Sequence, residues 1–309
     1  MVPPWADFFS DDRYEAFLRA VGAHFRARGR TARVEGDEGY VAVSDDPDLP
    51  RDMELGLSNL AQLCNQVPPN EWAARIDGHF EAMRRASRDG ADAERYFEDF
   101  AAARDLLAVR IGPAEGLAPM RGMLVAREDL PGTVSYLVLD FPHTVQNVPP
   151  DKARQWGRET AELFDVGLAN VRRMPAPEVS RLEDEDGSEL VALTGDHFFV
   201  ATHALFLHEH PQCLGPHGTL VIVPHRHAVL CCPVHDLRVV TAVQRLAILA
   251  DRMERDGPGS ISPRLYFRYP DGRFIVLPYV LGDKRFNFIP PDAFVDVLNQ
   301  LPQPPTGTR

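Results

Sequence analysis

Apolar residues in the first hundred positions recur mainly at the spacing of a helix. The clearest stripe runs from Tyr14 to Phe25, with an apolar side chain at about every third or fourth position. Ser10, Asp11 and Asp12 come just before it and suit the positive end of a helix dipole. Similar stripes predict three further helices, over 53–64, from Asn70 through Met83, and over 91–107.

One β-hairpin interrupts these helices. Residues 31–43 have the pattern of two short strands, and Gly-Asp-Glu-Gly at 36–39 supplies the residues of a turn. We therefore expect a mainly helical N-terminal region with a single hairpin over residues 1–112.

The strongest internal boundary lies at 112–119, which reads Gly-Pro-Ala-Glu-Gly-Leu-Ala-Pro. Glycine and proline at this density interrupt regular structure, and the pattern of apolar positions changes after them. We expect an α+β domain over 120–301. The polar, proline-containing end, 302–309, is expected to be a disordered tail.

Beyond this boundary a single plan recurs three times, a helix followed by a hairpin. Asp-Gly pairs at 186–187 and 271–272 separate apolar runs, which is a typical hairpin signal. Hairpins separated by single helices favour a mostly antiparallel sheet with helices on one face, hence an α+β fold. After strands near 122–127 and 134–141, the three expected units are helix 151–173 with strands 178–183 and 189–194, helix 196–210 with strands 218–223 and 227–233, and helix 236–255 with strands 264–269 and 274–280.

The second of these hairpins is apolar on both faces of its strands, which is the pattern of a central strand pair. Two adjacent cysteines in it, Cys231 and Cys232, are expected to act as small buried hydrophobes. The residues predicted to be buried are Val221, Val223, Val229 and Leu230.

Composition narrows the classes of partner. Among 309 residues there are 45 acids and 33 bases, a formal net charge of -12. An acidic chain lacks the basic footprint of nonspecific nucleic-acid binding. No stretch approaches the ~18 apolar residues of a membrane helix, and the first residues lack the features of a signal peptide. Four cysteines are too few for a disulfide scaffold, so we expect a cytoplasmic protein that binds neither nucleic acid nor membrane.

Motifs of the common nucleotide-binding and hydrolase classes are missing from the sequence. It contains no Gly-x-Gly-x-x-Gly, Walker loop, Gly-x-Ser-x-Gly, His-Glu-x-x-His or Cys-x-x-Cys. This pattern favours a role without catalysis but does not by itself decide whether the protein is an enzyme.

Histidines are concentrated in one stretch, with eight of the eleven between 197 and 235. On a strand, His225 and His227 would face the same side about 6.6 Å apart, so both rings could reach one divalent metal such as zinc. A third ligand would come from His203, His217 or Asp196. The alternative is that these histidines supply ordinary polar contacts.

Helical geometry argues against another pair. If 196–210 is an α-helix, His203 and His210 lie on one stripe but roughly 10 Å apart along the axis. Two ligands of one zinc must bring their nitrogens within about 4 Å, since each bond is ~2 Å long. Arg226, between the two histidines of the proposed strand, is expected to make a structural ion pair or to cap carbonyl groups.

Four short segments carry a family resemblance: 57–60 (Leu-Ser-Asn-Leu), 166–170 (Val-Gly-Leu-Ala-Asn), 196–205 (Asp-His-Phe-Phe-Val-Ala-Thr-His-Ala-Leu) and 218–227 (Gly-Thr-Leu-Val-Ile-Val-Pro-His-Arg-His). They resemble the YtpQ-like family, a bacterial group of unknown function. The resemblance is best over 120–235, and the family pattern has an arginine where His203 stands and an aspartate where His227 stands. The resemblance implies that the two positions are neighbours in space, and it transfers no catalytic residue.

Two functional hypotheses follow from these observations. The first is a non-enzymatic protein that acts through contacts with another protein, as an adaptor, a chaperone-like factor or an immunity-type factor. The second is a metal-dependent hydrolase in which His225, His227 and His203 hold a metal whose bound water has its pKa lowered to about 7.

Overall fold

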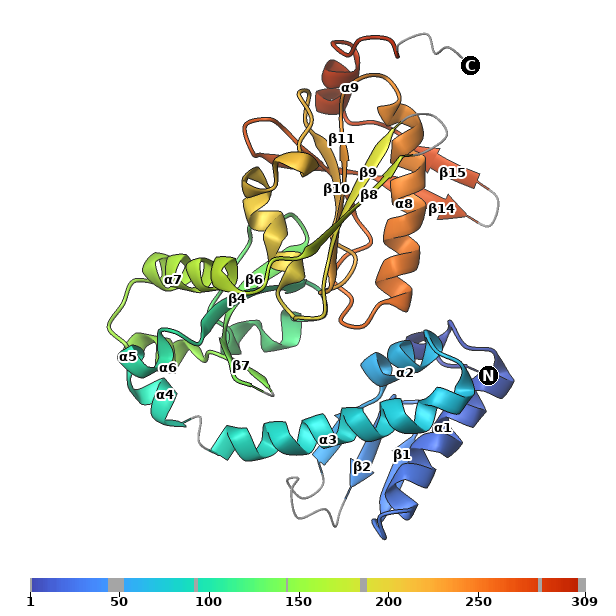
Figure 1. Ribbon diagram of the computed structural model, residues 1–309, viewed down its shortest axis with the longest axis vertical. Helices are drawn as coiled ribbons and strands as arrows, with labels where there is room; N and C mark the ends of the chain where they lie inside the picture. The colour runs from blue at the N-terminus through green and yellow to red at the C-terminus, as the bar shows by residue number, and fades with distance from the viewer. Residues whose placement is uncertain are drawn as a thin grey trace. The chain divides into compact units, whose positions relative to one another are not determined.

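The computed structural model describes residues 2–43, 53–91, 94–142, 144–183, 188–282 and 285–304. The chain divides into two compact units (Figure 1). The first contains Met1–Leu107, Val138–Glu159 and Asp256–Pro258, and the second contains Ala108–Leu137, Thr160–Arg255 and Gly259–Arg309.

The first unit packs three helices and a three-stranded antiparallel sheet on one core. Tyr14, Phe17, Val21 and Phe25 of α1 are buried there, which confirms the predicted stripe, and the Ser10 hydroxyl accepts a hydrogen bond from Arg13 N. The elements are η1 (Pro4–Ala6), α1 (Asp11–Arg26), β1 (Ala32–Glu35), β2 (Tyr40–Val43), β3 (Met53–Gly56), α2 (Ser58–Asn65), η2 (Pro69–Glu71), α3 (Trp72–Ala91), α4 (Glu94–Glu98), α5 (Phe100–Ala103), β7 (Val145–Asn147) and α6 (Pro150–Gln155).

The structure confirms the hairpin of 31–43 and corrects two of the predicted helices. Residues 53–56 form β3, which pairs with β2, because Glu54, Leu55, Gly56 and Leu57 alternate between exposed and buried positions. The helix expected over 91–107 is replaced by α4, α5 and the start of a strand.

A six-stranded antiparallel sheet forms the centre of the second unit, in the order β13-β12-β10-β11-β9-β8. Its strands are β8 (Glu178–Glu183), β9 (Glu189–Thr194), β10 (Thr219–Ile222), β11 (Ala228–Pro233), β12 (Leu265–Arg268) and β13 (Phe274–Leu277). The three predicted hairpins therefore lie next to one another in the sheet, and the α+β prediction is confirmed. The predicted central residues are buried: Val221, Val223, Val229 and Leu230.

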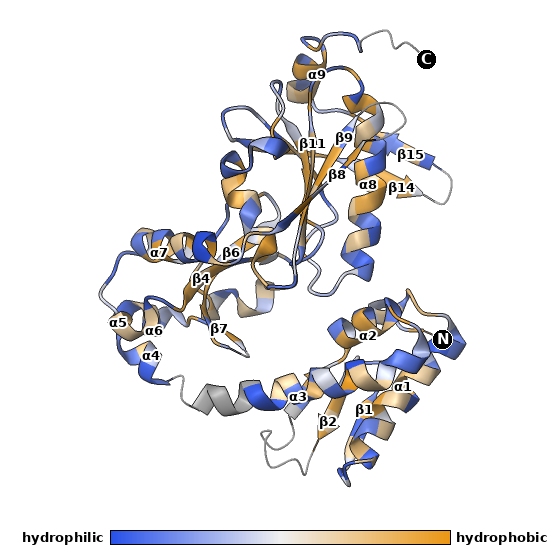
Figure 2. Cartoon of the chain, in the orientation of Figure 1, coloured by the Kyte–Doolittle hydropathy of each residue, from blue (hydrophilic) through white to orange (hydrophobic). Residues whose placement is uncertain are grey.

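Both faces of this sheet are covered. On one face α8 (Val239–Asp256) and α9 (Asp292–Leu298) pack against Leu220, Ile222 and Leu230. On the other, η4 (Val200–Glu209) and η5 (Pro211–Cys213) pack against Val221, Val229 and neighbours. The α-helices thus lie on one face, and a 3-10 segment, where the sequence predicts an ordinary helix, covers the opposite face. Hydrophobic residues follow the central strands and form bands along α8 (Figure 2).

The remaining strands and helices are shorter. Strand β6 (Thr133–Asp140) pairs with β5 (Ala126–Arg127) in the second unit and with β7 in the first, and β4 (Leu107–Pro113) lies on its other side. The helix predicted over 151–173 is divided into α6 and α7 (Thr160–Arg173), because Gly157 between them has a φ of 60°. The others are η3 (Ala118–Met123), β14 (Tyr279–Gly282) and β15 (Arg285–Phe288).

The predicted boundary at 112–119 lies inside the second unit, between β4 and η3. The semi-independence of 1–112 and 120–301 stays a prediction. The turn at 186–187 and residues 305–309 of the expected tail lie outside the described residues. In the portion of the chain that the structure describes, no helix combines the length and the apolar composition that a membrane crossing needs.

Candidate functional site

His225 and His227 lie in the loop between β10 and β11, not on a strand. Two backbone hydrogen bonds anchor its central residue: Arg226 N donates to Gly259 O at 3.1 Å, and Ala201 N donates to Arg226 O at 3.1 Å. Gly259 has a φ of 74°, and a Cβ there would lie 2.7 Å from Cδ of Arg226. The loop therefore depends on a glycine at 259.

Both ring nitrogens of His227 are occupied by hydrogen bonds. Its Nδ1 lies 3.0 Å from Gly195 O, so this nitrogen carries the proton, and its Nε2 accepts from Arg226 Nε at 3.0 Å. The ring of His225 lies 6.2 Å away, and its Nδ1 accepts from His227 N at 3.3 Å. Burial lowers the pKa of both rings, that of His225 to about 4. Both are therefore neutral at pH 7.

His203 pairs with His210. The Nδ1 of His203 lies 2.8 Å from the Nε2 of His210, a contact that α-helical geometry would forbid. It forms because the segment is a 3-10 helix with non-helical dihedral angles at Phe206, φ -132° and ψ 41°. Burial, followed by the neighbouring His210, lowers the pKa of His203 to about 4.

The proposed metal ligands do not gather into one group. Within the described residues, no three His, Cys, Asp or Glu side chains are placed so that they could hold a metal ion. No hydrogen bond or ring contact joins His203 to His227 in these same ranges, so the closeness expected from the family resemblance is not seen as a direct contact. Of the other candidates, Asp196 is exposed and His217 lines a separate pocket beside Tyr269.

Among the described residues, the Arg226 side chain makes neither the ion pair nor the carbonyl contacts that we expected. Its Nε donates to His227, and its guanidinium carbon lies 4.5 Å from the ring centroid of Phe198, a side chain that is 39% exposed. Burial lowers the pKa of Arg226 to about 10, and the nearby Arg110 adds to this effect. The sequence carries no signal for this arrangement, because Arg110 comes from β4, far away along the chain.

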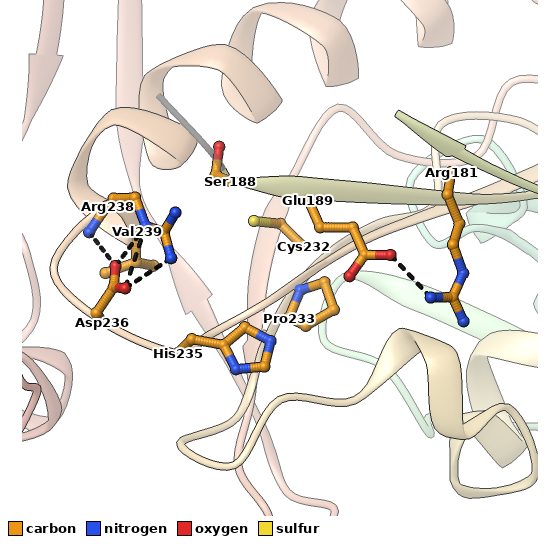
Figure 3. Close-up of a pocket in the computed structure, with 9 residues that line it drawn as sticks. All are labelled: Arg181, Ser188, Glu189, Cys232, Pro233, His235, Asp236, Arg238 and Val239. Atoms are coloured by element: carbon orange, nitrogen blue, oxygen red, sulfur yellow. Dashed lines mark hydrogen bonds and ion pairs between the residues drawn. The ribbon is translucent and has the colours of Figure 1, made fainter. Parts of the chain in front are cut away.

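A pocket of about 550 Å³ opens at the N-terminal end of α8 (Figure 3). Asp236 receives three hydrogen bonds of 2.8–3.1 Å from the Arg238 side chain, which lower the pKa of the carboxyl group. At the other end Arg181 pairs with Glu189 at 3.2 Å, and Cys232 and Pro233 lie between the two pairs. The carboxylates and guanidiniums of this pocket are thus already paired with one another, as in a structural site.

Edge strand β8 is the other unusual surface of the second unit. Among the described strands it has a neighbour, β9, on one side only, and every described side chain from Glu178 to Leu182 is exposed. Leu182 is 62% exposed and Val179 is 47% exposed. An edge strand with apolar side chains and unpaired backbone groups is a template for another strand.

Compared with protein-family models, with curated proteins and with solved structures, the chain gives no match in any of the three. The resemblance to YtpQ-like proteins stays a prediction.

Proposed function

We propose that this protein acts without catalysis, by binding another protein whose extended segment adds to the six-stranded sheet along β8. One observation carries the proposal: β8 is an edge strand whose described side chains are all exposed. Strand addition uses the backbone hydrogen bonds of such an edge for affinity and the flanking side chains for specificity.

The register of the sheet explains why β8 is open. Val179 lies opposite Leu193 and Leu182 lies opposite Leu190. Leu193 is buried in the core on the η4 side, and Leu190 is buried in the core on the α8 side. Both cores therefore end at β9, and β8 extends the sheet beyond the segments that cover it.

The side chains of β8 indicate which kind of partner segment would pair with it. Val179 and Leu182 occupy odd and even positions, so they lie on opposite faces of the strand. A matching segment carries apolar side chains on both of its faces. Glu178 is exposed at the start of the strand, and a basic residue in the partner would suit it. The charges of Glu178 and Arg181 also discourage unspecific pairing with other edges.

The test compares two double variants of the full chain. Val179→Lys with Leu182→Lys places charge on β8, whereas Val240→Lys with Ile248→Lys places the same charge on α8, where the two side chains are 56% and 47% exposed. A partner captured by the native chain is expected to bind the α8 variant normally and the β8 variant at least tenfold more weakly.

Hydrogen–deuterium exchange of the purified complex then locates the contact. We expect slower exchange of those amides of 178–183 that point away from β9 when the partner is bound, because strand addition pairs them. A partner that binds both double variants equally, or that protects another element only, contradicts the proposal.

Two further expectations belong to this proposal. The four cysteines are free and buried, which supports a cytoplasmic location. The metal-dependent hydrolase finds no support in the contacts of His203, His225 and His227, because hydrogen bonds to protein groups occupy ring nitrogens of all three.

A further inference from the structure

Two arginines from distant segments of the chain meet at one aromatic ring. The guanidinium carbon of Arg226, in the loop between β10 and β11, lies 4.5 Å from the ring centroid of Phe198. That of Arg110, in β4, lies 5.9 Å from the same centroid and 5.9 Å from the ring centroid of Tyr136. We name Arg110, Phe198 and Arg226 the arginine cluster. All of its residues belong to the second unit.

No carboxylate neutralises the arginine cluster within the described ranges of the chain. Other arginines of the second unit pair with acids, as Arg172 does with Glu209 at 2.6 Å and Arg238 with Asp236 at 2.8 Å. Arg226 gives its Nε hydrogen to neutral His227. The Nε of Arg110 is buried and has no hydrogen-bond partner among the described residues.

The two guanidiniums at the Phe198 ring are near enough for the charge of Arg110 to act on Arg226, and like charges repel each other. The lowered pKa of Arg226 has this origin, burial first and Arg110 second. His225 and His227, which lie beside Arg226, are neutral at pH 7 and supply no negative charge to it. The charge of Asp196 raises the pKa of His227, and this carboxylate forms an ion pair with neither arginine. A chain with a net charge of -12 thus keeps two uncompensated positive charges in one place.

We propose that the arginine cluster binds a phosphate monoester. Two guanidiniums without a carboxylate partner are neutralised by two negative charges. A phosphate monoester at pH 7 carries a charge of about -1.5 to -2. Guanidinium groups present N–H donors in a planar fork that matches phosphate oxygens. A single carboxylate would leave one positive charge without a partner. Phe198 holds both forks in place by cation–π contacts and leaves some of its ring exposed for the rest of the ligand.

The experiment titrates the full chain with phenyl phosphate, inorganic phosphate and acetate at constant ionic strength, and follows binding by isothermal titration calorimetry. Saturable binding of phenyl phosphate is expected, with acetate at least tenfold weaker. Arg110→Gln and Arg226→Gln should each weaken phenyl phosphate at least tenfold. Arg273→Gln is the control, because this arginine lies on the surface of the same unit and pairs with Asp271.

Loss of a half-buried arginine can also disturb folding, so the native chain supplies a second measurement. The side-chain Nε–H signals of Arg110 and Arg226 in a ¹⁵N-labelled sample should shift with phenyl phosphate and saturate at the calorimetric Kd. Equal affinity for acetate, unchanged arginine signals, or equal weakening by Arg273→Gln would each overturn the phosphate site. None of these results bears on strand addition at β8, since the two surfaces share no residue.

Discussion

The Nδ1 of His203 lies 2.8 Å from the Nε2 of His210, although the two residues are seven positions apart. One neutral imidazole donates to the other, and the pair is held among Phe206 and other buried side chains. Such a pair accepts a proton poorly, because the charged form would be desolvated among these side chains and repelled by the neighbouring Arg172. The consequence is a dependence of stability on pH.

Stability should therefore fall in mild acid. The folded pKa of His203 and of His225 is about 4, below the unfolded value of 6.5. Between these two values the unfolded chain binds more protons than the folded chain, so the free energy of unfolding decreases as the pH falls from 6.5 towards 4. Each such histidine contributes up to about 1.4 kcal/mol per pH unit within this window.

Thermal unfolding of the native chain and of His203→Leu between pH 7 and pH 5 measures this effect. The transition of the native chain should shift downward with acid more steeply than that of the variant. Parallel shifts in the two proteins would show that His203 is not a source of the dependence.

Leu230 reports on the centre of the sheet. It is 5% exposed, lies opposite Ile222 of β10 and packs in the core on the α8 side. Leu230→Ala should cost about 2–5 kcal/mol of unfolding free energy, because a cavity remains. Ile248→Ala, on the exposed side of α8, should change it by less than about 0.5 kcal/mol. Chemical denaturation of both variants makes the comparison, and a loss below about 1 kcal/mol at Leu230 would refute its central position.

Gly259 should tolerate alanine less well than Gly29 does. Both have a positive φ, 74° and 64°, so both substitutions carry a backbone penalty of about 1 kcal/mol. Only at Gly259 would the new Cβ meet another side chain, Cδ of Arg226 at 2.7 Å, whereas nothing lies within 4 Å at Gly29. Denaturation curves should therefore show a larger loss for Gly259→Ala than for Gly29→Ala. Equal losses would mean that the loop around Arg226 yields without cost.

Charge on β8 should leave the fold intact. Leu182 is 62% exposed and contributes to neither core, so Leu182→Lys should alter the free energy of unfolding by no more than about 0.5 kcal/mol. Circular dichroism and thermal unfolding provide the measurement. A large destabilisation would mean that β8 is covered in the folded chain, and the proposed binding surface would fall with it.

Local patterns predict most of the six-stranded sheet, because each of its hairpins is made by residues close together in the sequence. Val221 and Val229 can be placed in the core since the run is apolar on both faces. The helix predicted over 53–64 includes Leu55 and Leu57, although they alternate with Glu54 and Gly56, because a run of five residues fits both periods. Tertiary packing on β2 decides such a case in favour of the strand.

The contacts of the site residues could not be predicted from local patterns. The pairing of His203 with His210 depends on a kink at Phe206, which no local sequence pattern predicts. The meeting of Arg110 with Arg226 depends on how β4 lies against the loop after β10. No spacing in the sequence predicts such a contact, so the sequence indicates histidines as ligands, assigns Arg226 an ion pair or a carbonyl contact, and gives no sign of Arg110.

The order of the strands has a consequence for synthesis on the ribosome. The β8–β9 hairpin emerges first, β11 then pairs with β9, and β12 pairs last with β10. The sheet can therefore grow in one direction as the chain is made, each hairpin joining an edge that already exists. The strand that starts this growth is β8, and no later segment of the described chain pairs with its outer side.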